Sequence, residues 1–230
     1  MDEAEQFLTT LQLGDSFFPS GAFAYSSGLE TFVSGGLVRS REHLMRFIES
    51  YLLGLAGRND LLFVKLSWYG AASGNLDEIV RLDRLIHATK LVGELRGAST
   101  QMGRQLAKVM KGLYPLSIAG SLWQRLDGPG MEGHHPVIFG AVCGGIGVEL
   151  DKTLLTYLYA GVSSLVSAGV RLIPLGHSDG QLALNDLKPL MMRLVKAVGP
   201  LGEADISTFA PALEVRAMQH EDLFTRLFKS

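Results

Sequence analysis

The sequence has a single cysteine, Cys143, among its 230 residues. One cysteine cannot form a disulfide within the chain or supply a cysteine-rich metal site, so a reducing compartment is expected. The first five residues are acidic and lack the basic start and apolar run of a secretory signal. These absences together favour a cytoplasmic protein.

The chain also lacks an excess of charge of either sign. It carries 21 Lys and Arg against 23 Asp and Glu, a net charge of −2. Because binding to a phosphate backbone draws on a clear basic excess, no nucleic-acid partner is expected. Charged residues make up only 19% of the chain and hydrophobic residues 47%, a balance that excludes a disordered protein.

Long hydrophobic runs are missing as well. The longest stretch without a charged residue is 153–170, which is near the lower length limit for a membrane span. It contains threonine, serine, tyrosine and glycine, so it would be a poor span and predicts a buried helix instead. No membrane association is expected.

Helical periodicity is present along most of the sequence. Between Arg41 and Ala56, apolar residues recur every three or four positions, and Ser40 is a plausible N-cap. We find no repeats, no long linker and no alternating strands, which predicts one all-α domain of about nine to ten helices over residues 1–230. Further helices are predicted at 60–72, 76–87, 90–111, 136–149, 152–172 and 214–228.

Two of these segments are expected at the centre of the fold. Residues 136–149 and 152–172 are weakly polar and rich in small residues, which allow close helix crossings. Another helix is expected to begin at Asp186 as its cap and to reach about Ala197, with Pro189 in its first turn.

Motifs for nucleotide binding are absent. The pattern G-x-x-x-x-G-K-[ST] does not occur, so the chain should not hydrolyse nucleotides by itself. Glycines cluster within 140–147, but without the dinucleotide spacing or a preceding strand. Close helix packing is the better interpretation of this cluster.

An esterase of the GDSL type is the best enzyme hypothesis. The segment Gly14-Asp15-Ser16-Phe17 resembles the nucleophile block of that family, and 57–60 loosely resembles another block. A serine nucleophile needs a histidine oriented by an acid, which that family supplies in a D-x-x-H motif. None of the six histidines has Asp three positions before it, and the expected strands are missing.

Three residues of one segment are potential metal ligands: His134, His135 and Cys143. Neighbouring side chains of an extended segment point to opposite faces, so a site would need further ligands from elsewhere or from a second chain. The pair His220-Glu221 lacks the second histidine of H-E-x-x-H. No metal site within the chain is therefore expected, and capping or loop roles are the alternative.

Five blocks of sequence follow one another in an order and spacing known from one protein family. The first block is Asp15–Glu30, DSFFPSGAFAYSSGLE, and the last joins His220-Glu221 to residues 226–230. Between them lie 94–96 with 99–104, then 134–140, and then 171–176 with 179–181. The pattern resembles the urease accessory protein family UreF, and it covers essentially the whole chain.

The resemblance implies an all-helical, dimeric, cytoplasmic factor without catalysis of its own. In that family the protein bridges the scaffold UreD, also called UreH, which contacts apo-urease, and the GTPase UreG, which delivers nickel. It therefore implies a role in nickel insertion into urease and in regulating GTP-dependent delivery. Nickel and GTP would be bound by the partner GTPase, so no cofactor of this chain's own is expected. A helical scaffold for another partner is the alternative.

An amphipathic C-terminal tail, about 212–230, is expected to bind a partner. Its apolar residues have too few neighbours in sequence to become buried, and docking in a partner's groove would satisfy them. We expect the tail to order on the scaffold protein; packing on its own domain is the alternative.

Residues outside the tail complete the predicted partner surface. Tyr25 and Glu30 lie in a Gly- and Ser-rich block that suits recognition, with helix capping and a core tyrosine as the alternative. Arg171 either caps its own helix or reaches a partner, and the partner is favoured. The full predicted set is Tyr25, Glu30, Arg171, Gln181, His220, Glu221, Phe224, Arg226, Leu227, Phe228 and Ser230.

Overall fold

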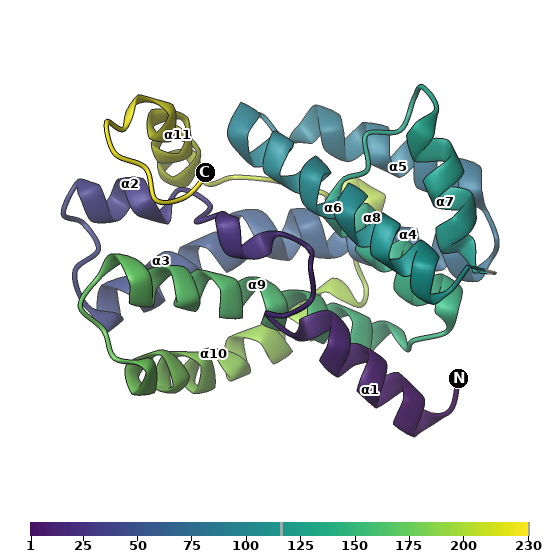
Figure 1. The fold of residues 1–230 in the computed structure, drawn as a ribbon, viewed down its shortest axis with the longest axis horizontal. Coiled ribbons are helices and arrows are strands. Elements are labelled where there is room, and N and C mark those ends of the chain that lie inside the picture. Colours follow the sequence, from purple (N-terminus) through teal and green to yellow (C-terminus); the bar gives the residue numbers. More distant parts are fainter. Residues whose placement is uncertain (116, 230) are drawn as a thin grey trace.

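The computed structural model describes residues 1–115 and 117–229, and these residues contain helices but no β-strand. The predicted all-α class is confirmed. Ten of the α-helices in the described residues have nine or more residues, in agreement with the expected nine to ten. The α-helices (Figure 1) are α1 Glu3–Gly14, α2 Leu29–Ser34, α3 Arg41–Tyr51, α4 Leu61–Ala72, α5 Leu76–Thr89, α6 Gly93–Leu113, α7 Ile118–Asp127, α8 His135–Ile146, α9 Leu150–Leu172, α10 His177–Val198 and α11 Pro211–Gln219. The shorter elements are the 3-10 helices η1 Ala22–Ala24, η3 Glu203–Asp205 and η4 His220–Asp222 and the π-helix η2 Leu52–Asp60.

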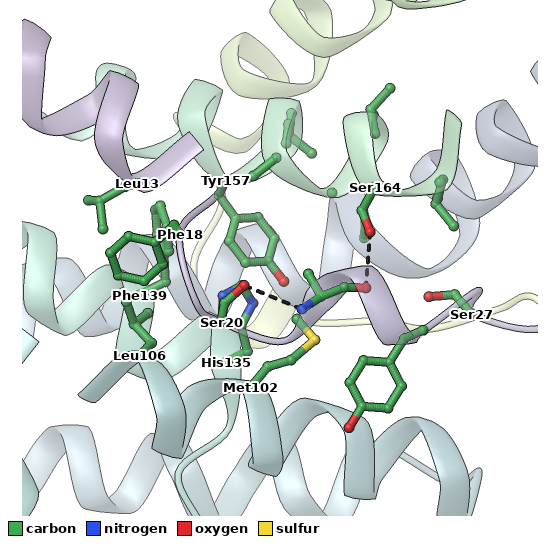
Figure 2. Close-up of a pocket in the computed structure, with 18 of the residues that line it drawn as sticks. Leu13, Phe18, Ser20, Ser27, Met102, Leu106, His135, Phe139, Tyr157 and Ser164 are labelled. Atoms are coloured by element: carbon green, nitrogen blue, oxygen red, sulfur yellow. Dashed lines mark hydrogen bonds between the residues drawn. The ribbon is translucent and has the colours of Figure 1, made fainter. Parts of the chain in front are cut away.

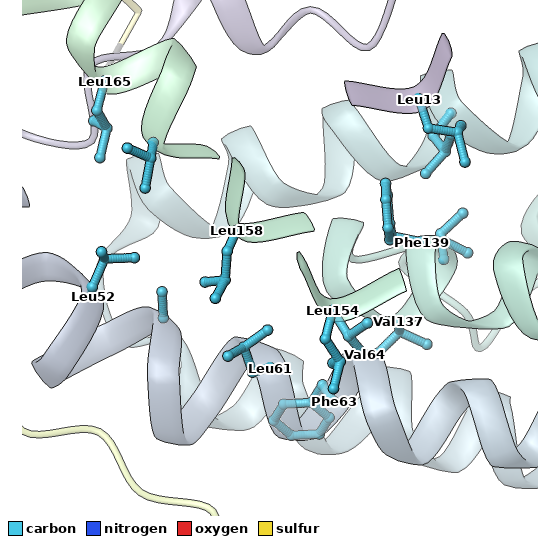
Figure 3. Packing of buried hydrophobic residues seen from close by; sticks show 14 of the residues in the cluster. Leu13, Leu52, Leu61, Phe63, Val64, Val137, Phe139, Leu154, Leu158 and Leu165 are labelled. Atoms are coloured by element: carbon cyan, nitrogen blue, oxygen red, sulfur yellow. The ribbon is translucent and has the colours of Figure 1, made fainter. Parts of the chain in front are cut away.

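Helices α4 and α8 pack closely at the centre, with α6 and α9 against α8 (Figure 3). Nine of the twelve residues of α8 are buried. A Cβ atom at Gly140 would overlap the carbonyl oxygen of Val64, and one at Gly144 would lie 2.5 Å from that of Trp68. The glycines therefore let two backbones approach, which confirms close helix packing as the reason for this cluster. Figure 3 shows apolar side chains from several helices meeting in this region, among them Phe63, Val137 and Leu154.

Helix α9 was expected to be central, but only one of its faces is buried. Eight of its 23 residues are buried, whereas Leu155 and Tyr159 remain exposed. By length and composition α9 could cross a membrane, and 44% of its most apolar window is buried within the fold. The buried face packs against α10, α1 and α8.

The expected start of helix α10 was wrong. The helix begins at His177, where the Asp179 carboxylate accepts a hydrogen bond from the N–H of Gly176 at 3.1 Å, and Pro189 lies in its interior. Asp186 forms an ion pair with Arg41 of α3 instead of a cap. Asp179 in the first turn thus replaces the predicted cap Asp186, which lies seven residues later.

Helices α3 and α4 are joined without a break through the π-helix η2. The Ser40 hydroxyl accepts from the N–H of His43, which confirms the predicted N-cap of α3. The π-helix places Asn59 and Asp60 in the interior, where both are buried.

A buried lysine of α4 closes the end of α10. The ammonium of Lys65 donates to the carbonyl oxygens of Val198, Gly199 and Leu201 at 3.1, 2.5 and 2.7 Å. A positive charge at this position satisfies carbonyls that the helix leaves without partners and favours the negative end of its dipole.

The predicted helix over 214–228 was wrong in its second half. Helix α11 ends at Gln219, a single 3-10 turn follows, and the chain then leaves helical geometry. The amides of Leu227 and Phe228, which a helix would pair with carbonyls one turn earlier, donate to a distant carboxylate instead.

Candidate partner-binding site

Residues 220–229 run back from α11 beside α2, and we call them the C-terminal strap (Figure 1). The N–H groups of Leu227 and Phe228 donate to Glu30 Oε1 and Oε2 at 2.6 and 3.1 Å. The N–H of Lys229 donates to the carbonyl oxygen of Ala24 at 2.9 Å. The strap is therefore fastened by its backbone to the segment 24–30.

The position of Glu30 follows from the local sequence. Gly28 has φ +85°, a left-handed conformation that glycine adopts at little cost, and it turns the chain into α2. A Cβ atom there would lie 3.3 Å from that of Ala217 on α11. The turn thus brings Glu30, in the first turn of α2, under the end of α11.

His220 joins two carboxylates at the start of the strap. It is fully buried, with Nε2 3.0 Å from Glu30 Oε2 and Nδ1 2.8 Å from Glu94 Oε2. A neutral imidazole carries one N–H, so two such contacts need a second proton on the ring or on a carboxyl group. The three side chains form one proton-sharing unit that ties α2, α6 and the strap together.

Arg226 extends this unit to the surface. Its Nη1 donates to Glu94 Oε1 at 3.2 Å, so each oxygen of Glu94 has a partner in the strap. The Glu94 side chain is mostly buried and that of Arg226 is exposed. We call Glu30, Glu94, His220 and Arg226 the strap clamp.

The Glu30 carboxylate is held in its charged form. Burial by itself raises the pKa of Glu30, but hydrogen bonds from His220 and from the N–H groups of Leu227 and Phe228 outweigh it. The resulting pKa lies below the usual glutamate range. The strap therefore depends on a carboxylate that remains ionised in the folded state.

Arg171, at the end of α9, lies between two phenylalanines. Its guanidinium carbon is 3.7 Å from the ring centre of Phe23 and 4.3 Å from that of Phe228. It also donates to the carbonyl oxygens of Phe23 and Ser167 at 3.0 and 3.4 Å. Burial lowers the pKa of the guanidinium without changing its charge near neutral pH. Arg171 thus binds carbonyl oxygens of its own chain and holds the strap by cation–π contacts.

Part of the tail packs on its own domain, and its contact with a scaffold protein stays a prediction. Phe228 is 4% exposed and packs on its own chain, which is the alternative we left open. Phe224 and Leu227 point outward, with exposures of 103% and 63%. The strap is therefore fastened on one side and presents two unpaired apolar side chains on the other.

The remaining predicted residues are dispersed. The Tyr25 hydroxyl forms a hydrogen bond with the Gln101 side chain, and the Tyr25 side chain is buried. Gln181 is exposed on α10 and no hydrogen bond joins it to the strap within the described residues. Glu221 is exposed beside the clamp, and Ser230 lies outside the described residues.

The esterase geometry is missing around Ser16. Its hydroxyl lies 3.4 Å from Asp15 Oδ1, and no described histidine forms a hydrogen bond with it. His43, the histidine nearest in sequence, contacts the N–H of Arg39 instead. A serine without an imidazole base is not activated as a nucleophile.

The three potential metal ligands take other roles. His134 is fully buried, with Nδ1 3.1 Å from the Ser99 hydroxyl and Nε2 3.1 Å from His87 Nδ1. Burial lowers the pKa of His134 to about 3 and that of His135 to about 4. Burial also raises the pKa of the Cys143 thiol to about 12. Among the described residues, no group of three His, Cys, Asp or Glu is arranged to hold a metal ion.

Sequence reasoning missed an interior polar cluster and the role of Glu94. Asp60 accepts from Lys90 Nζ at 2.8 Å and from the Tyr157 hydroxyl at 3.1 Å. Burial and the nearby Asp60 raise the pKa of Tyr157 well above its usual value. These pairs join η2, α5 and α9, and nothing in their spacing could have revealed them. The position of Glu94 in a family block was the one available signal for its role.

A cavity of about 100 Å³ lies beside this cluster (Figure 2). Apolar side chains such as Leu13, Phe18 and Phe139 line one end, and His135 and Tyr157 project into it. Two hydrogen bonds at its rim fix Ala22 of η1: its N–H donates to Ser20 and its carbonyl accepts from Ser164. The block that carries the family resemblance is therefore anchored on α9.

These features define an all-helical protein whose C-terminal strap is held on its inner side by the clamp and presents Phe224 and Leu227 on its outer side. The family model UreF matches residues 38–188. The urease accessory protein UreF of Bacillus sp. (strain TB-90) is 32% identical over 98% of this chain and 99% of its own length. UreF of Trichormus variabilis is 33% identical over 97% of this chain and 96% of its own length. UreF of Arthrobacter sp. (strain FB24) is 34% identical over the same shares of the two chains. The chain belongs to the UreF family of urease accessory proteins.

Proposed function

We propose that this chain acts in urease maturation as an adaptor that is required for nickel insertion. It binds the UreD/UreH scaffold and the GTPase UreG, and through them apo-urease, and it regulates GTP-dependent nickel delivery. The observation that carries the proposal is the similarity to urease accessory proteins over nearly the full length of both chains. The protein works in the cytoplasm, as the urease maturation role requires.

The strap is the part of the chain that we assign to the scaffold. Phe224 and Leu227 extend from a backbone that Glu30 and His220 hold in place. Preorganised apolar side chains lose little conformational entropy when they enter a groove, which supports binding at this place. Glu30, His220, Arg171 and Phe228 then act through the strap's shape, and Phe224 and Leu227 make the contact.

The proposed role involves no catalysis by this chain. Nickel and GTP are bound by the partner GTPase. The proposal is supported by the lack of a phosphate-binding loop in the sequence and by the unactivated state of Ser16 and Cys143.

We further propose a homodimer that uses a groove between α1, α9 and α10. The groove measures about 740 Å³ and is mostly apolar. Its lining includes Leu11, Leu155, Tyr159 and Met192, all of them exposed large hydrophobic residues. A second copy of the chain would bury these side chains by a symmetric contact of α9.

The test is light scattering after size exclusion, with the protein alone and mixed with purified UreD-type scaffold and UreG-type GTPase. We expect a dimer that enters a larger complex, and Phe224→Ala with Leu227→Ala should remove the scaffold from it. Met218→Ala changes an exposed apolar residue on α11 and serves as the control. Leu155→Glu should give a monomer. A wild-type protein that ignores both partners would contradict the adaptor function.

A further inference from the structure

The charges of the chain are unevenly distributed along the sequence. Residues 95–126 contain no aspartate or glutamate, although the whole chain has a net charge of −2. Helices α6 and α7 take up most of this stretch. The basic residues in it are Arg96, Arg104, Lys108, Lys111 and Arg125.

Part of this acid-free region forms a groove that we call the basic groove. It has a volume of about 470 Å³ and lies between α6, α7, the loop before η1 and the end of the strap. No Asp or Glu is present among the described residues that line it. The lining residues used below are Gln101, Arg104, Lys108, Trp123 and Lys229.

Fixed groups form the wall of the basic groove. The guanidinium of Arg104 donates to the carbonyl oxygens of Glu132, Leu126 and Met131 at 2.8, 3.1 and 3.1 Å, which holds its charge in one place. The Lys111 ammonium lies 5.3 Å from the ring centre of Trp123. This cation–π contact favours the position of the indole in the lining of the basic groove. The groove therefore has a rigid cationic and aromatic side.

Two further cations at the rim are exposed. Lys108 and Lys229 form no ion pair among the described residues, whereas Arg125 of the same stretch pairs with Asp77 at 3.0 Å. Because the side chains of Lys108 and Lys229 are exposed, their ammonium groups can reach a ligand without breaking an ion pair among the described residues. The described lining of the groove therefore contains basic residues and no acidic residue, in a protein that is slightly negative overall.

We propose that the basic groove binds an acidic segment of a partner protein, with Lys108 and Lys229 facing its carboxylates and Trp123 packing against an apolar side chain. Complementary charge supports this occupant, and so does continuity with the strap, since Lys229 belongs to both. A nucleic acid fits less well because it presents phosphates along a path longer than this groove and would meet the chain's 23 acidic residues. The choice of a protein as the occupant rests on the proposed function.

The inference is tested with a fluorescein-labelled peptide of about twelve residues, made of Glu and Asp around one Trp, by fluorescence anisotropy. We expect binding to the full chain at about 0.05 M NaCl and clear weakening at about 0.3 M NaCl. Lys108→Glu together with Lys229→Glu should lower the affinity about tenfold or more, because both cations become repulsive. Arg193→Glu reverses an exposed cation on α10 that does not line the groove, and it should leave the affinity unchanged.

Two outcomes overturn the proposal. One is an equal affinity of the wild type, the double variant and the Arg193 variant for the peptide. The other is a tighter complex with the oligonucleotide dT12 that the same double variant abolishes, because the groove would then be a polyanion site. Assembly of the complex with scaffold and GTPase distinguishes a failure of this inference from a failure of the proposed function. If only the inference fails, the Lys108→Glu and Lys229→Glu double variant still assembles with both partners as the wild type does.

Discussion

The imidazole of His220 lies 3.0 Å from the Glu30 carboxylate, which also accepts the N–H groups of Leu227 and Phe228. One carboxylate therefore holds both ends of the strap. The two residues are 190 positions apart in the sequence, so the C-terminal segment is fastened by a side chain from the start of the chain.

Replacing His220 should loosen the strap. His220→Ala leaves the buried carboxylates of Glu30 and Glu94 without the imidazole between them, and a buried polar group that loses its hydrogen-bond partner costs about 1–3 kcal/mol. We expect faster hydrogen exchange at residues 223–229 and a lower midpoint of urea unfolding. Glu221→Gln, at an exposed neighbour, should change neither. Unchanged exchange in His220→Ala would show that the clamp does not hold the strap.

Acid should release the strap. The pKa of Glu30 is lowered in the folded chain, so its contribution is present above the ordinary glutamate pKa of 4.5 and is lost as the pH falls through the folded value. The amide signals of Leu227 and Phe228 in ¹H–¹⁵N spectra should therefore move to disordered positions below about pH 4.5. Glu30→Gln, which cannot ionise, should show weakened strap order without this transition. Strap amides that stay folded well below that pH would contradict the assignment.

Protonation of His134 should contribute to acid unfolding. Burial, followed by the nearby Lys90, lowers the pKa of His134 to about 3, below the ordinary value of 6.5. Between these values the unfolded chain binds the extra proton, so stability rises with pH and falls on acidification, by about 1.4 kcal/mol per pH unit for one such group.

His134→Gln keeps one amide near Ser99 and removes the titration. It should lower the unfolding free energy at pH 7.5 and flatten its dependence on pH between about 6 and 4. His135, whose pKa is also lowered, supplies the slope that remains. A full wild-type slope in His134→Gln would show that His134 is not neutral in the fold.

Gly140 should tolerate no side chain. A Cβ atom there would overlap the carbonyl oxygen of Val64, and forced overpacking of a core costs about 1–3 kcal/mol. Gly140→Ala should lower the urea midpoint accordingly. Gly161→Ala on α9, where nothing lies within 4 Å of the added Cβ atom, should be neutral or stabilising by up to about 1 kcal/mol. If the two substitutions changed the urea midpoint equally, helix propensity rather than packing would determine the effect of alanine at these positions.

Local signals predicted most of the fold. The apolar period and the Ser40 cap placed α3, and the small residues of 136–149 predicted the close crossing of α8. The predicted helix ends are wrong where hydrogen bonds that the periodicity does not reveal set the end of the helix. The amides near Phe228 pair with Glu30 instead of continuing a helix, and α10 begins nine residues early because Asp179 caps it.

The sequence predicted which residues belong to the candidate site but not what each of them does there. The family blocks contained Glu30, Arg171, His220 and Phe228, which the structure brings together. The blocks could not show that these groups hold the strap in place while Phe224 and Leu227 face outward. Which side chains become buried depends on how the helices pack together, so the spacing of residues within one segment does not predict it.

The contact of Lys65 with the end of α10 has a consequence for the order of folding. The ammonium closes carbonyls that lie 133 to 136 residues later in the chain. During synthesis α4 emerges long before those carbonyls exist. The Lys65 ammonium therefore has no carbonyl partners at the end of α10 until that part of the chain has been made. The last turn of α10 in turn depends on a side chain from a distant helix. Contacts of such long separation form late and slow the search. Lys65→Met should therefore speed the unfolding of the finished protein more than it slows the early steps of its folding.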